Sequence, residues 1–285
     1  MDLAEGMLAL VGAYPLVLLA LGLFWLVQDA RGELTVQPPN SLPAWNTRWP
    51  EFLLFLTGSA FLVIVLSSLA TNATVDWETN SVLEAWRMPV VGLVFQLTML
   101  AIIVVGFQPK TNFLTFKINP RLAPKGEVFR AGFHQFVISI PLVFVFAAGW
   151  EGLLKLANFL GFPVSLERQE LLELFDFNQP IALTILLLVT AIVIAPVTEE
   201  LLFRGVIYRF LKGRFSARSS AISSSLIFSA IHGYEMSFLP LFLLGMLLCR
   251  SYEKEHNILA PIFFHALFNA NTIALLFLAQ ALTPS

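Results

Sequence analysis

Three short polar groups interrupt the apolar C-terminal half of the sequence, and their residue types are those of hydrolytic chemistry. They are Glu-Glu-Leu-Leu-Phe-Arg at 199–204, Phe-Ser-Ala-Ile-His at 228–232 and His-Ala-Leu-Phe-Asn at 265–269. An ionisable side chain inside a membrane helix costs about 2.5–3.5 kcal/mol on insertion scales, and such residues therefore usually pair with one another or serve a function. Each of the three groups needs an explanation of this kind.

Helical spacing separates the two carboxylates of the first group. Glu200 and Arg204 stand four positions apart on one helical face, with the acid N-terminal to the base, which is the more favourable order for an ion pair. Glu199 lies about 100° around the helix from Glu200, so it points elsewhere and keeps a carboxylate for chemistry. A purely structural ion pair is the alternative explanation for Glu200 and Arg204.

The inventory of side chains suffices for hydrolysis of an amide bond. A carboxylate beside an imidazole can hold a water molecule and take its proton. His265 and Asn269 share one helical face and can donate hydrogen bonds to a developing oxyanion. Glu199, His232 and His265 could instead bind a divalent metal, because imidazoles and carboxylates are usual zinc ligands. The His-Glu-x-x-His pattern is absent, so the spacing leaves both a metal-bound and a carboxylate-activated water open.

These side chains must share one depth in the membrane if they form one site. With helix ends near residues 210, 218 and 257, a rise of 1.5 Å per residue puts Glu199 about 16 Å deep and His232 about 21 Å deep. The same rise puts His265 about 12 Å deep and Asn269 about 18 Å deep. Six serines in 218–232 are small enough to let neighbouring helices come close. We therefore expect the three groups to meet.

The composition places these groups in a membrane protein. The 285 residues are 57% hydrophobic and only 13% charged, and the mean hydropathy is +0.78. Apolar runs of about 20 residues recur along the chain, as in polytopic membrane proteins. A net charge of −2 argues against nucleic acid as a partner. The single cysteine, Cys249, excludes an internal disulfide, and the acidic first residues are unlike those of a cleavable signal peptide.

We predict an all-α fold, a polytopic integral membrane helical bundle of about eight transmembrane helices, because backbone in lipid must satisfy its own hydrogen bonds. The predicted spans are roughly 7–28, 51–70, 88–107, 132–150, 180–210, 218–232, 236–250 and 257–281. Residues 1–150 would form an N-terminal scaffold of spans, and residues 180–281 a catalytic membrane domain. A short amphipathic helix near 164–176 is too charged to cross and should lie on the outer interface, as a connector or as a cover for the site.

Positive charge predicts the orientation of the bundle. The sequence has 17 Lys and Arg residues. Only Arg87, Lys155 and Arg168 fall on one side of the eight-span arrangement, which leaves fourteen on the other (17 − 3). By the positive-inside rule the fourteen mark the cytoplasmic side. We therefore expect an integral protein of the cell (plasma) membrane with both termini outside.

The three groups, in this order, resemble the Glu-Glu-x-x-x-Arg, Phe-x-x-x-His and His-x-x-x-Asn motifs of the CAAX protease and bacteriocin-processing family, called CPBP or Abi. The members of this family are intramembrane proteases that are widely described as metalloproteases. They include the type II CAAX prenyl endopeptidases, to which this sequence is similar. The resemblance covers about residues 180–275. It implies a role for each matching position: Glu199 resembles the carboxylate that activates water, and His232 its partner in holding that water.

The resemblance assigns the other positions as well. His265 and Asn269 match residues that support the oxyanion, and in the metal view His265 matches a ligand. Glu200 and Arg204 match the paired charges that shape the site. The resemblance leaves zinc and metal-free, glutamate-dependent hydrolysis as alternatives.

We therefore expect an intramembrane endopeptidase that hydrolyses a membrane-associated peptide or protein, either prenylated or leader-bearing. Its partners would be the lipid bilayer and that substrate. Two other function classes stay open. A non-catalytic immunity or scaffold protein of the same fold would use the buried ion pair for folding. A proton-coupled transporter would use intramembrane acids and histidines as a relay, although no inverted repeat is visible in the sequence.

Overall fold

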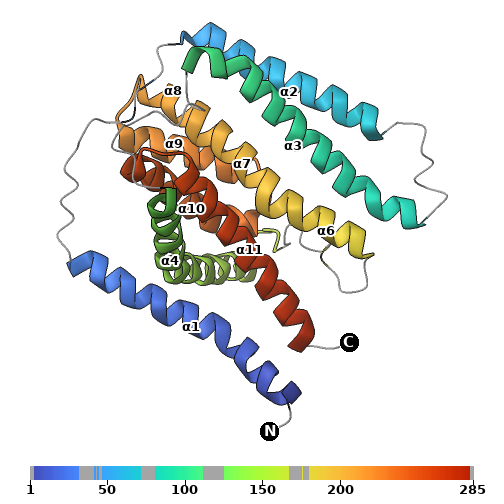
Figure 1. Ribbon diagram of the computed structural model, residues 1–285, viewed down its shortest axis with the longest axis vertical. Helices are drawn as coiled ribbons and strands as arrows, with labels where there is room; N and C mark the ends of the chain where they lie inside the picture. The colour runs from blue at the N-terminus through green and yellow to red at the C-terminus, as the bar shows by residue number, and fades with distance from the viewer. Residues whose placement is uncertain are drawn as a thin grey trace.

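The computed structural model describes residues 3–31, 42, 44, 47–71, 81–111, 125–166, 175 and 180–282. All regular structure within these residues is helical (Figure 1). The helices before the site are α1 (Leu3–Arg31), α2 (Trp49–Thr71), α3 (Ser81–Thr111) and α4 (Lys125–Phe159). One continuous helical segment follows, made of α6 (Ile181–Val189), η2 (Thr190–Ile194), α7 (Ala195–Glu200), η3 (Leu201–Tyr208) and α8 (Arg209–Lys212). The last helices are α9 (Ala217–Ala230), α10 (Glu235–Glu255) and α11 (Leu259–Leu282).

The predicted polytopic helical bundle is confirmed, with a different number of full-length spans. Among the described residues, six helices are long and apolar enough to cross a membrane. They are Trp49–Thr71, Ala85–Val105, Gly126–Phe159, Ile181–Lys212, Glu235–Glu255 and Leu259–Leu282. A shorter apolar helix covers Ala13–Val27 within α1. The span predicted at 218–232 corresponds to α9, whose 14 residues extend only about 21 Å, less than the roughly 30 Å of hydrocarbon.

The site-bearing helices occupy the middle of the bundle. α10 packs on α9 and α4, α11 packs on α4, and α2 pairs with α3. Figure 1 shows α2 and α3 side by side on one flank and α1 along the other, with α10 and α11 between them. α1 approaches α4 closely because Gly22 has no side chain: a Cβ there would lie 2.5 Å from the carbonyl oxygen of Val137. Close backbone approach at small residues is typical of helix packing in membranes.

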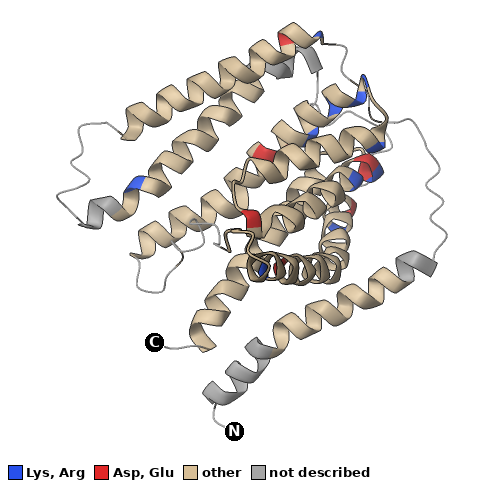
Figure 2. Ribbon diagram, turned by 180° about the vertical axis from the view of Figure 1, so that it is seen from behind, with Lys and Arg blue, Asp and Glu red and all other residues tan. Residues whose placement is uncertain are grey.

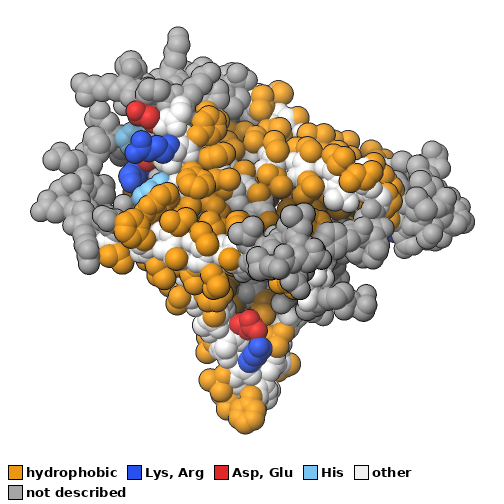
Figure 3. Space-filling view, turned by 60° about the horizontal axis from the view of Figure 1, so that its bottom comes forward, with side chains coloured by type: hydrophobic (Ala, Val, Ile, Leu, Met, Phe, Trp, Pro, Cys, Tyr) orange, Lys and Arg blue, Asp and Glu red, His pale blue; other side chains and the backbone are white. Residues whose placement is uncertain are grey.

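The surface of the bundle is that of a protein surrounded by lipid. Large apolar side chains stand far out of the bundle, among them Leu54, Val105 and Phe159, which are 73%, 77% and 85% exposed. Figure 2 shows that most of the described Lys and Arg residues lie around α8 and the end of α10. Figure 3 shows one face that is largely hydrophobic, with charged and histidine side chains together at one side and a further acidic and basic pair at the lower tip. This distribution fits an integral membrane protein.

The helix predicted to begin at 164 does not begin there. Residues 162–166 are not helical, and two hydrogen bonds between Asn158 and Val164 explain why. The Asn158 amide donates to the Val164 carbonyl at 2.9 Å and accepts from its backbone N–H at 3.0 Å, so the chain turns instead of continuing a helix. Residues 167–174 and 176 of the predicted interfacial helix lie outside the described residues.

Candidate active site

The helical segment Ile181–Lys212 carries both site carboxylates on a short α-helical stretch between two π-helical ones. α7 has six residues, of which Glu199 and Glu200 are the last two. It is preceded by the π-helix η2 and followed by the π-helix η3. π-Helical turns are rare and occur frequently at functional sites. Each of them changes the angular position of the residues that follow, so the direction of the carboxylates depends on η2.

A proline explains why the carbonyl of Ala191 in η2 needs a partner from another helix. The N–H of Ala195 bonds to the carbonyl of Thr190, five residues earlier. In the same pattern the carbonyl of Ala191 would bond to residue 196, which is a proline and has no N–H. The side chain of Asn269 on α11 supplies the missing donor, with Nδ2 at 2.9 Å from the Ala191 oxygen. Asn269 thus ties α11 to the π-helical turn ahead of the carboxylates.

The predicted ion pair between Glu200 and Arg204 is present and fully buried. Nη1 of Arg204 donates to Oε1 of Glu200 at 2.8 Å, and both side chains are 0% exposed. Nη2 of Arg204 donates to the carbonyl oxygen of Gly245 on α10 at 3.2 Å, and its guanidinium lies 4.7 Å from the ring centroid of Phe228. A Cβ on Gly245 would lie 2.8 Å from the Cβ of Ser225. Glycine at this position therefore lets α10 bring its carbonyl to Arg204.

His265 joins the ion pair to the second carboxylate. Its Nδ1 lies 2.8 Å from Oε1 of Glu200, and its Nε2 lies 3.8 Å from Oε2 of Glu199. Because an ionised carboxylate can only accept a hydrogen bond, Nδ1 carries the hydrogen, and the neutral ring presents a lone pair on Nε2 toward Glu199. The Glu199 side chain is 20% exposed, whereas that of His265 is 4% exposed. Glu199 is therefore the accessible member of the cluster.

His232 lies at the edge of this cluster, behind Phe228. Its Nδ1 is 2.7 Å from the carbonyl oxygen of Phe228, one helical turn earlier. The Phe228 ring packs edge-on against the imidazoles of both histidines, with centroids 4.8 Å from His232 and 6.0 Å from His265. In the described part of the chain, the histidine within ion-pair distance of Glu199 is His265. The shared contact of His232 and Glu199 with one water stays a prediction.

The described side chains of the cluster do not form a ready-made zinc site. A structural or catalytic zinc site needs at least three protein ligands around one point. Within the described ranges, no three His, Cys, Asp or Glu side chains are placed to hold a metal ion. Nδ1 of His265 is directed at Glu200, and Nδ1 of His232 at its own helix. A zinc ion held by Glu199, His232 and His265 stays a prediction.

Comparison with known proteins finds a similarity in the C-terminal part of the chain. Residues 181–271 match the model of the family described as "Type II CAAX prenyl endopeptidase Rce1-like". We refer to these residues as the Rce1-like segment because of this similarity. The resemblance that the three motifs indicate is thereby confirmed for residues 181–271.

An uncharacterized 24.3 kDa protein of Escherichia coli is 29% identical over 123 residues, which cover 41% of this chain and 56% of that protein. The match thus spans little more than half the length of this relative. No solved structure matches the chain.

The geometry of the Rce1-like segment favours a water molecule between Glu199 and His265. Two hydrogen-bond acceptors, Oε2 of Glu199 and Nε2 of His265, face each other at 3.8 Å, and neither can donate to the other. A water molecule about 2.8 Å from each of these two atoms could donate one of its hydrogens to Glu199 and the other to His265. Oε2 of the neighbouring Glu200 has no hydrogen-bond partner among the described residues, which fits a site that holds water.

The oxyanion roles expected for His265 and Asn269 meet a constraint. His265 presents an acceptor, not a donor, at Nε2 while it is neutral, and one N–H of Asn269 is committed to Ala191. The sequence did not predict the roles of two residues in the Rce1-like segment. The carbonyl of Gly245 accepts a hydrogen bond from Arg204, and the carbonyl of Ala191 accepts one from Asn269. For Ala191, the sequence signal is Pro196, five residues later.

Proposed function

We propose that this protein is an intramembrane endopeptidase that hydrolyses peptide bonds in membrane-associated peptides or proteins. The observation that carries the proposal is the pair of facing acceptors, Glu199 and His265, 3.8 Å apart inside the Rce1-like segment. A carboxylate and an imidazole at this separation can orient one water through both of its hydrogens. Such an oriented water is the nucleophile that amide hydrolysis requires.

The proposed reaction needs only the groups already described. Glu199 takes a proton from the water as its oxygen attacks the carbonyl carbon of the scissile peptide bond. The resulting tetrahedral intermediate carries the negative charge on the former carbonyl oxygen. Glu199 then gives the proton to the leaving nitrogen, the carbon–nitrogen bond breaks, and a carboxylic acid and an amine result. The remaining N–H of Asn269 is the candidate donor to the oxyanion. Nδ1 of His232 donates to the carbonyl of Phe228, so its Nε2 is a candidate acceptor for an N–H of the substrate backbone.

Glu200 and Arg204 act in this proposal as positioning residues. Oε1 of Glu200 receives hydrogen bonds from both Arg204 and His265, each at 2.8 Å. The accepted hydrogen fixes the tautomer of His265, and the buried guanidinium holds the Glu200 carboxylate in place. The ion pair therefore decides which nitrogen of His265 faces the water.

An apolar cavity beside His232 supports a substrate with an apolar part. It has a volume of about 420 Å³ and is lined by Ser229, Ala230 and Gly233 at the end of α9, with Trp150 of α4 and Phe238 of α10 among its walls. Cavities of this size bind small apolar groups or a few side chains. We propose that prenylated or leader-bearing substrates place an apolar segment here while the bilayer holds the rest.

The proposal is tested by comparing the peptide termini formed in membranes that contain the wild type or Glu199→Gln. The variant keeps the size of the side chain and removes its basicity. We expect new termini with the wild type and with Glu51→Gln, a matched change in an exposed acid of α2, and none with Glu199→Gln. Equal termini in all three preparations would refute the role of Glu199. A non-catalytic immunity or scaffold protein would give no new termini with any of them.

A further inference from the structure

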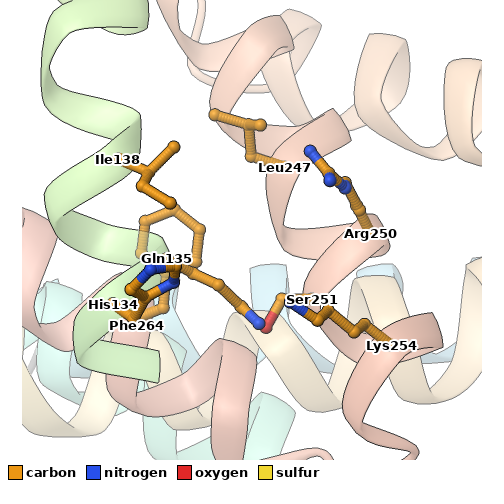
Figure 4. A pocket seen from close by; sticks show the side chains of 8 residues that line it. All are labelled: His134, Gln135, Ile138, Leu247, Arg250, Ser251, Lys254 and Phe264. Atoms are coloured by element: carbon orange, nitrogen blue, oxygen red, sulfur yellow. The ribbon is translucent and has the colours of Figure 1, made fainter. Parts of the chain in front are cut away.

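A second group of polar side chains lies outside the cluster of Glu199, Glu200, Arg204 and His265, where α4, α10 and α11 meet (Figure 4). They surround a cavity of about 30 Å³, lined on its polar side by His134, Gln135, Arg250, Ser251 and Lys254. None of these residues takes part in the proposed hydrolysis. The cavity has room for the oxygens of one small anion, with the rest of that molecule outside.

We infer that this cavity binds the phosphate group of an anionic phospholipid. Arg250 and Lys254 stand four positions apart on α10, so two positive charges share one helical face, and both residues line the cavity. A guanidinium binds two phosphate oxygens at once, and an ammonium adds a second positive charge. Figure 4 shows both side chains on the α10 side of the cavity, with Ser251 beside them.

Ser251 provides an observation that is independent of charge. The residue is 1% exposed, it lines the cavity, and its hydroxyl has no hydrogen-bond partner among the described residues. A buried hydroxyl without a partner is destabilising. A phosphate oxygen in the cavity would accept a hydrogen bond from the Ser251 hydroxyl and so satisfy this buried donor.

Gln135 adds selectivity for the kind of headgroup. Its Nε2 donates to Oε1 of Glu255 at 3.1 Å, while its carbonyl oxygen has no partner within the part of the chain described. A phosphate without hydrogens cannot satisfy this oxygen, but a hydroxyl on the headgroup can. A glycerol headgroup carries both a phosphate and hydroxyls, so phosphatidylglycerol is the probe that the cavity fits best.

The surroundings of the cavity favour a lipid as the source of the phosphate. Trp25 of α1 stacks on His134, with ring centroids 4.9 Å apart and planes inclined by 29°, and tryptophan is enriched at the membrane interface. Lys254 lies in the last turn of α10. Three apolar side chains, Ile138, Leu247 and Phe264, complete the lining of the cavity. Basic pockets between transmembrane helices are known lipid headgroup sites.

The test measures lipid binding to the full-length protein in nanodiscs by native mass spectrometry. Discs of phosphatidylcholine receive increasing phosphatidylglycerol, and we compare the wild type with the double variant Arg250→Gln/Lys254→Gln. We expect the wild type to bind phosphatidylglycerol about tenfold more tightly than phosphatidylcholine, and the double variant to lose this preference. The control is Arg48→Gln/Arg218→Gln, which removes two exposed cations elsewhere and should keep it. Equal preferences in the wild type and the pocket variant would overturn the inference.

A second variant and a second anion keep the test decisive. Ser251→Ala retains both charges, and we expect it to weaken phosphatidylglycerol binding about threefold, even if the double variant fails to fold. Inorganic phosphate is added as a soluble competitor to discs that contain phosphatidylglycerol, and to discs of phosphatidylcholine alone. Displacement of phosphatidylglycerol by phosphate from the wild type supports the site. Stabilisation by phosphate without any preference for phosphatidylglycerol would refute a lipid as the source.

Discussion

Arg204→Met should lower the stability of the protein by about 3–5 kcal/mol, the cost of removing one partner from a buried ion pair. Methionine keeps an unbranched, flexible side chain and lacks the guanidinium group. The Glu200 carboxylate, 0% exposed, would then keep its hydrogen bond from His265 but lose the guanidinium 2.8 Å away. The carbonyl of Gly245 would also lose its donor at 3.2 Å.

A double-mutant cycle separates the charge from the packing. Glu200→Gln/Arg204→Met removes both charges, so it should be at least about 2 kcal/mol more stable than Arg204→Met alone. Unfolding in mixed micelles by increasing SDS measures the wild type, the single variants Glu200→Gln and Arg204→Met, and the double variant. Arg218→Met, an exposed position on α9, is the matched control and should stay within about 0.5 kcal/mol of the wild type. If Arg204→Met unfolds together with this control, the buried ion pair does not hold the site together.

Three further predictions concern the neighbouring groups. Asn269→Leu should lower the free energy of unfolding by about 1–3 kcal/mol in the same assay, because it leaves the carbonyl of Ala191 without its donor. An unchanged free energy of unfolding would contradict a stabilising contact between Asn269 and η2. Gly245→Ala should lower the free energy of unfolding by about 1–3 kcal/mol, because its Cβ would lie 2.8 Å from Ser225. Adding Ser225→Gly to this variant should restore part of the lost stability. Wild-type stability of Gly245→Ala alone would exclude a tight contact at this position. Zinc measured in protein purified without added metal should be well below one ion per chain, whereas one zinc per chain, lost in His232→Ala, would establish a metal site.

The sequence contained enough to predict the helical membrane bundle and the ion pair of the site. Long apolar runs admit few structures in lipid, and the spacing of Glu200 and Arg204 follows directly from the helical repeat. The number of full-length spans was less predictable. The run at 218–232 is apolar enough to be a span, yet its helix ends at Ala230 after 14 residues and the chain turns at Gly233, where φ is +74°.

The partner of Glu199 could not be predicted from depth alone. The estimated depths gave positions along the membrane normal but no direction around each helix. The two π-helical segments change that direction, and they depend on contacts between helices, such as the one from Asn269 to Ala191. As a result, His265 faces Glu199, whereas His232 lies behind the ring of Phe228.

The rate of peptide-bond cleavage by Glu199→Gln tests most directly whether Glu199 activates the water. A substrate identified from its new termini is cleaved under single-turnover conditions in liposomes, and the unfolding midpoint of each protein is measured in parallel. We expect Glu199→Gln to cleave about 10²–10⁴-fold more slowly than the wild type, with an unchanged unfolding midpoint and unchanged substrate binding. Cleavage by Glu199→Gln within twofold of the wild-type rate would show that another group takes the proton.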